Sequence, residues 1–148
     1  MKYITDNSRI LSREELSSPE EITNEIPLDK ESSKLIFGAR RSISQILHRQ
    51  DDRLIVVVGP CSIHDPKSAI EYAELLKEFS ASVENELMLV MRVYFEKPRT
   101  TIGWKGLIND PRIDNSFQIN EGLRVSRKLL KDIANLGMPT GTEFLDLI

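Results

Sequence analysis

The sequence predicts an α/β fold in which parallel strands alternate with helices. Two observations support this prediction. Short runs rich in β-branched and other apolar residues occupy 54–58 and 87–93, and the segments between the runs carry apolar residues at three- and four-residue steps. The resulting order of strand, helix, strand, helix and strand predicts parallel strands joined by right-handed crossovers. We therefore expect the ends of the strands to meet at one edge of a sheet.

The chain begins with an arm and continues into a helix. Residues 1 to about 31 mix polar residues with two prolines and scattered apolar side chains, which is typical of an arm with short ordered pieces. From Ser32 to about Gln50 the apolar residues share one helical face and predict the first long helix. They are Leu35, Ile36, Ala39, Ile43, Ile46 and Leu47.

The first strand and the helix after it have clear boundaries. The apolar run 54–58 lies between charged residues and a Gly-Pro pair, and its continuous β-branched character is typical of a strand buried on both faces. Asp65 suits the N-cap of the next helix, with Pro66 at its first position. The apolar stripe that predicts this helix consists of Ala69, Tyr72, Ala73, Leu76 and Phe79.

The second strand leads into a long loop and a further helix. The loop runs from Tyr94 to about Asn115, and loops of this length usually serve a function. Gly137 suits a left-handed cap at the end of the next helix, before a third strand at about 140–145. That helix is marked by Leu123, Arg127, Leu130 and either Ile133 or Ala134. Three strands cannot close an eight-stranded barrel, so we expect a partial sequence.

Composition excludes several classes of partner. The formal net charge of -3 gives no electrostatic reason to expect a nucleic acid or an anionic membrane. The chain has no stretch long enough to span a membrane, and an acidic residue follows the start before any signal-like apolar segment. Its single cysteine fits a reducing compartment. These features predict a cytoplasmic protein.

The segment GPCSIHD (59–65) places Cys61 and His64 directly after the first strand, where α/β folds build their sites. Two interpretations stay open from residue type alone. Cys61 is either a metal ligand or a small buried apolar residue, and His64 either takes part in a site or satisfies a local hydrogen bond.

The segment MRVYFEKPRTT (91–101) follows the second strand with three cations and two hydroxyls. Arginine offers a planar fork for phosphate or carboxylate oxygens, and lysine adds a compact charge, so the segment predicts a phosphate site. The competing interpretation is a solvated run of charge. Trp104, which lies near Gly103 and Gly106, is interpreted as loop packing in preference to an aromatic wall of the site.

These two segments, together with GWKGLINDP (103–111), DNSFQIN (114–120) and EFLD (143–146), occur in an order that resembles the feedback-regulated class I 3-deoxy-D-arabino-heptulosonate 7-phosphate (DAHP) synthases. The resemblance implies the N-terminal portion of a (β/α)8 TIM barrel preceded by a regulatory N-terminal extension. Residues 1–50 would form the regulatory and oligomerisation arm with its helix, and residues 51–148 the truncated first part of the barrel. The implied reaction joins phosphoenolpyruvate, erythrose 4-phosphate and water to give DAHP and phosphate.

The resemblance also assigns roles to residues at the strand ends. Cys61 resembles the family's metal-binding cysteine, for a divalent metal such as manganese or iron. The other ligands, a histidine, a glutamate and an aspartate, would come from later strands beyond residue 148. Arg92 and Lys97 resemble residues that hold phosphoenolpyruvate, and Lys97 also suits proton transfer or polarisation of the partner carbonyl.

Further roles follow from the same resemblance. Pro98, Arg99 and Thr100 resemble the residues that grip erythrose 4-phosphate. Glu143 resembles the carboxylate associated with an active-site water and is a catalytic candidate beside Lys97.

Regulation is implied by two positions outside the substrate loop. Asp6 and Phe144 correspond to the family's allosteric region, where an aromatic amino acid binds. The residue sequences of the DNSFQIN and EFLD segments are most similar to those of the phenylalanine-sensitive type. The family also implies a homodimer or homotetramer.

Two other functions are weighed against this one. The chain could be a non-catalytic fragment that binds an aromatic amino acid or a full-length subunit. A sister synthase that uses arabinose 5-phosphate is the other alternative, and the KPRTTIGWKGL loop (97–107) and the regulatory arm favour the aromatic pathway over it.

Overall fold

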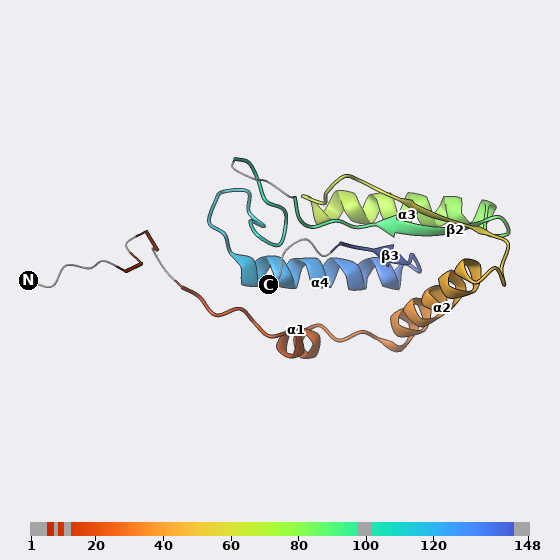
Figure 1. Ribbon diagram of the computed structural model, residues 1–148, viewed down its shortest axis with the longest axis horizontal. Coiled ribbons are helices and arrows are strands. Elements are labelled where there is room, and N and C mark those ends of the chain that lie inside the picture. Colours follow the sequence, from red (N-terminus) through yellow and green to blue (C-terminus); the bar gives the residue numbers. More distant parts are fainter. Residues whose placement is uncertain (1–5, 8, 11–12, 98–101, 144–148) are drawn as a thin grey trace, which may run out of the picture.

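The computed structural model describes residues 6–7, 9–10, 13–97 and 102–143. Within these ranges, helices and strands alternate as the sequence predicts, and an arm precedes them (Figure 1). The elements are α1 (Pro19–Glu25), α2 (Lys30–Leu47), β1 (Leu54–Val58), α3 (Pro66–Ser82), β2 (Leu87–Arg92), α4 (Ile119–Asn135) and β3 (Thr140–Gly141).

The strands form one parallel sheet in the order β1-β2-β3. β1 pairs with β2 along its whole length, from Leu54 opposite Leu87 to Val58 opposite Met91. β3 pairs with the end of β2, where Thr140 lies opposite Met91. Helices α3 and α4 form the crossovers and contact one another as well as the sheet (Figure 1). The predicted parallel topology is confirmed.

Local sequence explains where the helices begin. Asp65 caps α3 by accepting hydrogen bonds from the backbone N–H groups of Lys67 and Ser68, with Pro66 at the first helical position, as predicted. The hydroxyl and N–H of Ser68 lower the pKa of Asp65, because hydrogen bonds to a carboxylate favour its charged form. The loop that carries Cys61 therefore ends at a fixed point.

The core lies between the sheet and helices α3 and α4. Met91 and Ile133 are fully buried there, from β2 and α4 respectively. A close approach brings the loop before α4 onto that helix. A Cβ atom at Gly122 would lie 2.1 Å from the carbonyl oxygen of Ile108, so no larger residue fits. Gly137 has φ +83° and ends the helical segment in the left-handed conformation, as predicted.

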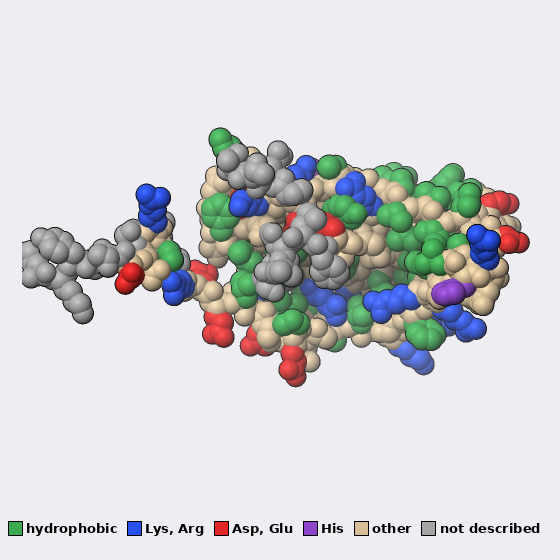
Figure 2. Space-filling view, viewed as in Figure 1, with side chains coloured by type: hydrophobic (Ala, Val, Ile, Leu, Met, Phe, Trp, Pro, Cys, Tyr) green, Lys and Arg blue, Asp and Glu red, His purple; other side chains and the backbone are tan. Residues whose placement is uncertain are grey.

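One prediction about β1 is wrong. The sequence predicts a strand buried on both faces, but Leu54 and Val57 are 68% and 56% exposed. Val58 is also exposed. β1 lies at the edge of the described sheet and has a neighbouring strand on one side only, so fewer side chains from neighbouring elements cover its faces. Apolar side chains are exposed over the region of the sheet in Figure 2.

The arm is attached to α4 by side-chain contacts. Asn120 accepts a hydrogen bond from the N–H of Ser17 at 2.8 Å and donates to the carbonyl of Glu15 at 3.0 Å. Arg124 binds Glu25 through two hydrogen bonds of 2.6 and 2.7 Å. The described residues before these contacts, 6–7, 9–10 and 13–14, lie away from the body of the molecule (Figure 1). Residues 15–25 therefore form a clasp on α4.

None of the helices in the described ranges combines the length and the hydropathy that a bilayer-spanning segment requires.

We expect the 148-residue chain by itself to self-associate through the open edge of β1. Exposed apolar strand edges are templates for pairing with another chain. The substitution Val57→Lys places a charge on this edge and is expected to increase the monomer fraction, measured by sedimentation velocity. Self-association that is unchanged in this variant would exclude the β1 edge as its cause.

The clasp on α4 is expected to weaken in acid. Hydrogen bonding to Arg124 lowers the pKa of Glu25, so this stabilisation is present above the unfolded pKa of about 4.3 and is lost as the pH falls through the lower folded value. Protection of residues 13–29 against hydrogen exchange, relative to the intrinsic rate at each pH, should fall in that acidic range. Arg124→Ala should raise exchange at neutral pH and flatten its pH dependence. An equal acid response in this variant would contradict the prediction.

Candidate active site

The carboxyl ends of the three strands bring separate parts of the sequence together. Cys61 follows β1 and Lys97 follows β2, and the Nζ atom of Lys97 lies 3.8 Å from the Sγ atom of Cys61. Parallel pairing produces this proximity, because it places the ends of neighbouring strands side by side. The expectation that the ends of the strands meet at one edge of the sheet is confirmed.

Arg92 is held at the end of β2 by its neighbours. Its Nη1 atom donates a hydrogen bond to the carbonyl of Pro60 at 3.3 Å, and its guanidinium carbon lies 3.9 Å from the centre of the Tyr94 ring. A cation over an aromatic face is an attractive arrangement. A Cβ atom at Gly59 would lie 2.4 Å from the carbonyl oxygen of Arg92, so only glycine allows the two strand ends to approach this closely.

The backbone between Arg92 and Lys97 is bonded to the loop after β1. The N–H of Ile63 donates to the carbonyl of Tyr94 at 2.7 Å, and the hydroxyl of Ser62 donates to the carbonyl of Glu96 at 3.3 Å. These bonds fix the Cys61 loop relative to the cation-bearing segment.

Residues 96–97 pair with residues 105–106 at the base of a loop. The N–H of Lys97 donates to the carbonyl of Lys105 at 3.0 Å, and Glu96 forms an antiparallel bridge with Gly106. Gly106 has φ +112°, and a Cβ atom there would lie 2.1 Å from the carbonyl oxygen of Phe95. The base of this loop therefore requires glycine at position 106.

Cys61 is an exposed free thiol. The interpretation of this residue as a small buried apolar side chain is therefore wrong. The Nζ atom of Lys97 lies beside this thiol. Within the described ranges, no three His, Cys, Asp or Glu side chains are placed to hold a metal ion together. Cys61 fits a metal site as one ligand, and a complete site needs ligands from elsewhere.

Glu143 makes contacts that the sequence did not reveal. Its Oε1 atom accepts hydrogen bonds from the backbone N–H groups of Phe95 and Glu96, both at 3.1 Å. Its Oε2 atom lies 3.5 Å from the hydroxyl of Thr142. No sequence pattern signals a carboxylate that binds a backbone 47 or 48 positions away, because the contact depends on strand register.

Other predicted residues have different outcomes. Pro98, Arg99, Thr100 and Phe144 lie outside the described residues, so their roles stay predictions. Asp6 is described and exposed in the arm.

The rings of His64 and Trp104, from two of the sequence motifs, lie close to each other. His64 is exposed and lies edge-on to the Trp104 ring, with 6.5 Å between ring centres. Trp104 packs against the core and donates from Nε1 to the carbonyl of Asp110 at 2.8 Å. The interpretation of Trp104 as loop packing is confirmed.

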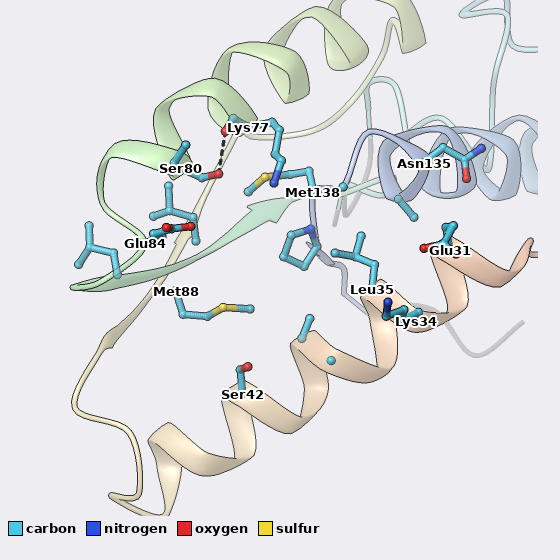
Figure 3. A pocket seen from close by; sticks show the side chains of 18 of the residues that line it. Glu31, Lys34, Leu35, Ser42, Lys77, Ser80, Glu84, Met88, Asn135 and Met138 are labelled. Atoms are coloured by element: carbon cyan, nitrogen blue, oxygen red, sulfur yellow. Dashed lines mark hydrogen bonds between the residues drawn. The ribbon is translucent and has the colours of Figure 1, made fainter.

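A separate groove of about 570 Å³ lies at the opposite end of the sheet, between α2, the end of α3 and the start of β3. Figure 3 shows Lys77 reaching from α3 towards Met138, above Leu35 of α2. This groove contains none of the predicted site residues. It is therefore distinct from the candidate active site.

A parallel sheet with a thiol, two cations and a carboxylate at its carboxyl edge defines an α/β protein with a ligand site in the usual position for such folds. The model of the DAHP synthetase I family matches residues 23–148, and the chain belongs to this family.

Individual relatives agree with this assignment. The chain is 57% identical over 143 residues to phospho-2-dehydro-3-deoxyheptonate aldolase of Amycolatopsis methanolica, a match that covers 97% of this chain and 70% of the relative. It is 53% identical over 148 residues to the Phe-sensitive enzyme of that name from Escherichia coli K12, covering 100% of this chain and 42% of the relative. The chain thus spans less than half of the Escherichia coli protein.

A solved structure is also similar. The phospho-2-dehydro-3-deoxyheptonate aldolase of Francisella tularensis SCHU S4 superposes with a TM-score of 0.90 at 54% sequence identity. The superposition covers 94% of this chain and 41% of that one.

Gly106→Ala is expected to destabilise the pairing of Gly106 with Glu96 at the base of the loop. The positive φ and the contact with Phe95 make a side chain strained there, at a cost of roughly 1–3 kcal/mol in the free energy of unfolding. Gly38→Ala in α2 is the matched control, because a Cβ atom there meets nothing within 4 Å. Alanine has a higher helix propensity than glycine, so Gly38→Ala should increase the free energy of unfolding by up to about 1 kcal/mol. Urea unfolding of both variants measures the difference, and equal effects would contradict it.

Proposed function

We propose that this chain is the N-terminal part of a DAHP synthase, the enzyme that condenses phosphoenolpyruvate with erythrose 4-phosphate in aromatic amino-acid biosynthesis. The observation that carries the proposal is the contact of 3.8 Å between the Lys97 ammonium and the Cys61 thiol, beside Arg92 at the carboxyl edge of the sheet. Family membership and the names of the relatives support it.

In the proposed reaction, C3 of phosphoenolpyruvate attacks the aldehyde carbon of the sugar phosphate, water adds at C2, and inorganic phosphate leaves. Arg92 and Lys97 hold the anionic phosphoenolpyruvate, and the stacking of Arg92 on Tyr94 sets the direction of its guanidinium. Pre-placed cations lower the repulsion between two anionic substrates. Lys97 also donates a proton to, or polarises, the reacting oxygen.

The remaining candidates complete the proposed site. Pro98, Arg99 and Thr100 bind the phosphate end of erythrose 4-phosphate, and Glu143 holds the water that adds at C2. Cys61 supplies one thiolate ligand to a divalent manganese or iron ion. When bound, such an ion acts as a Lewis acid towards the aldehyde.

The whole protein is proposed to be a (β/α)8 barrel with a regulatory extension, cytoplasmic, and assembled as a homodimer or homotetramer. An aromatic amino acid binds at a region that includes Asp6 and Phe144. The names of two relatives, one Phe-sensitive and one tyrosine-inhibited, support feedback control of this kind.

A second candidate function is a non-catalytic fragment that pairs with a full-length subunit. The exposed apolar edge of β1 favours it, because an open strand edge can add a strand from another chain.

The test is release of inorganic phosphate from phosphoenolpyruvate in the presence of erythrose 4-phosphate and manganese. The 148-residue chain is compared with the longer protein encoded by the same reading frame up to its next stop codon. We expect activity in the longer protein, and loss of about 100-fold or more in its Cys61→Ala and Lys97→Ala variants. Lys34→Ala, in the groove at the far end of the sheet, is the control and should retain activity.

Two outcomes would decide against the proposal. Folded proteins of both lengths without activity would overturn the enzyme assignment. Stable binding of the 148-residue chain to a full-length subunit, together with that inactivity, would favour the fragment function.

A further inference from the structure

The side chain of Glu143 continues the hydrogen bonding of the sheet beyond the end of β3. In the regular ladder, the N–H of Val93 donates to the carbonyl of Gly141 at 2.9 Å. Two residues further along each chain, the N–H of Phe95 meets the Oε1 atom of Glu143 in place of a backbone carbonyl. The N–H of Glu96 shares the same oxygen. A carboxylate therefore occupies the next acceptor position of the ladder.

This substitution changes the path of the chain. In an extended strand, successive N–H groups point to opposite sides, so one acceptor cannot bind both. Because Phe95 and Glu96 both donate to one Glu143 oxygen, the backbone has turned out of the sheet at this point. Lys97 is the next residue, and its N–H donates a hydrogen bond to the carbonyl of Lys105 at the base of the loop.

The turn is restrained from both sides of β2. On the β1 side, the Ser62 hydroxyl binds the carbonyl of Glu96. On the β3 side, the Glu143 carboxylate binds the adjoining N–H groups, and hydrogen bonds to a charged acceptor are the stronger kind. Such restraint matters for Lys97, whose ammonium must stay near Cys61 to serve the site.

We propose that Glu143 is a positioning residue for Lys97: its carboxylate holds the Phe95 and Glu96 backbone and thereby sets the lysine beside Cys61. This inference rests on the proposed function, in which Lys97 binds phosphoenolpyruvate. It gives Glu143 a task that differs from holding the reacting water, because it acts through the backbone and is present before any substrate binds.

The first measurement is hydrogen exchange of the 92–97 segment in the longer protein without substrate. Glu143→Ala removes the acceptor and should increase exchange at Phe95 and Glu96. Glu143→Gln retains a neutral oxygen acceptor and should restore part of the protection. Glu71→Gln, an exposed acid on α3, is the matched control and should leave exchange unchanged.

The second measurement is phosphoenolpyruvate affinity in a double-mutant cycle with Lys97→Ala. Glu143→Ala should weaken binding by roughly 10- to 100-fold, the range expected for the loss of hydrogen bonds to a charged group. The same substitution should have little further effect once Lys97 is alanine, because the carboxylate acts through that lysine. Glu143→Gln should recover part of the affinity.

Each contrary result has a defined meaning. Unchanged exchange in Glu143→Ala would overturn the backbone contact, and increased exchange with unchanged affinity would overturn the positioning of Lys97. Additive losses in the cycle would also overturn it. If Glu143→Ala stops turnover while exchange and affinity stay normal, the residue serves the water instead. Failure of the unmodified longer protein to bind phosphoenolpyruvate would overturn the proposed function, while the exchange measurement would still test the contact.

Discussion

Parallel pairing of β2 with a strand on each side is the constraint on which the candidate site depends. Register alone decides that the Cys61 loop and the Lys97 turn meet, since their side chains come from positions 36 residues apart. The backbone hydrogen bond from Ile63 to Tyr94 then keeps the two segments together beyond the end of the strands. Removing the pairing would separate the thiol from the ammonium without altering either residue.

Glycine at two positions makes this close pairing possible. Gly59 lets the end of β1 lie against the backbone of Arg92, and Gly106 lets the returning chain lie against Phe95. Both contacts are between backbones, so a neighbouring side chain cannot adjust to relieve a clash. Chemistry at this edge therefore depends on residues that carry no functional group, as much as on the cations and the thiol.

Local signals made much of the fold predictable. Asp65 and Pro66 define the start of α3 through atoms within three residues, and Gly137 marks the end of α4 by its own conformation. The exposure of Leu54 could not be predicted in this way, because burial of a strand depends on which neighbours pair with it. The bonds from Glu143 to the 95–96 backbone were equally hidden, since they arise from the register of β3 against β2.

The groove and the candidate active site occupy opposite ends of the same sheet. The groove is lined by residues of α2, the end of α3 and the turn before β3. At the other end, geometry is restricted by backbone contacts and by several hydrogen bonds to one short segment. Substitutions around Lys34 and Met88 can therefore change how firmly α2 is held without altering the backbone contacts at the carboxyl edge of the sheet.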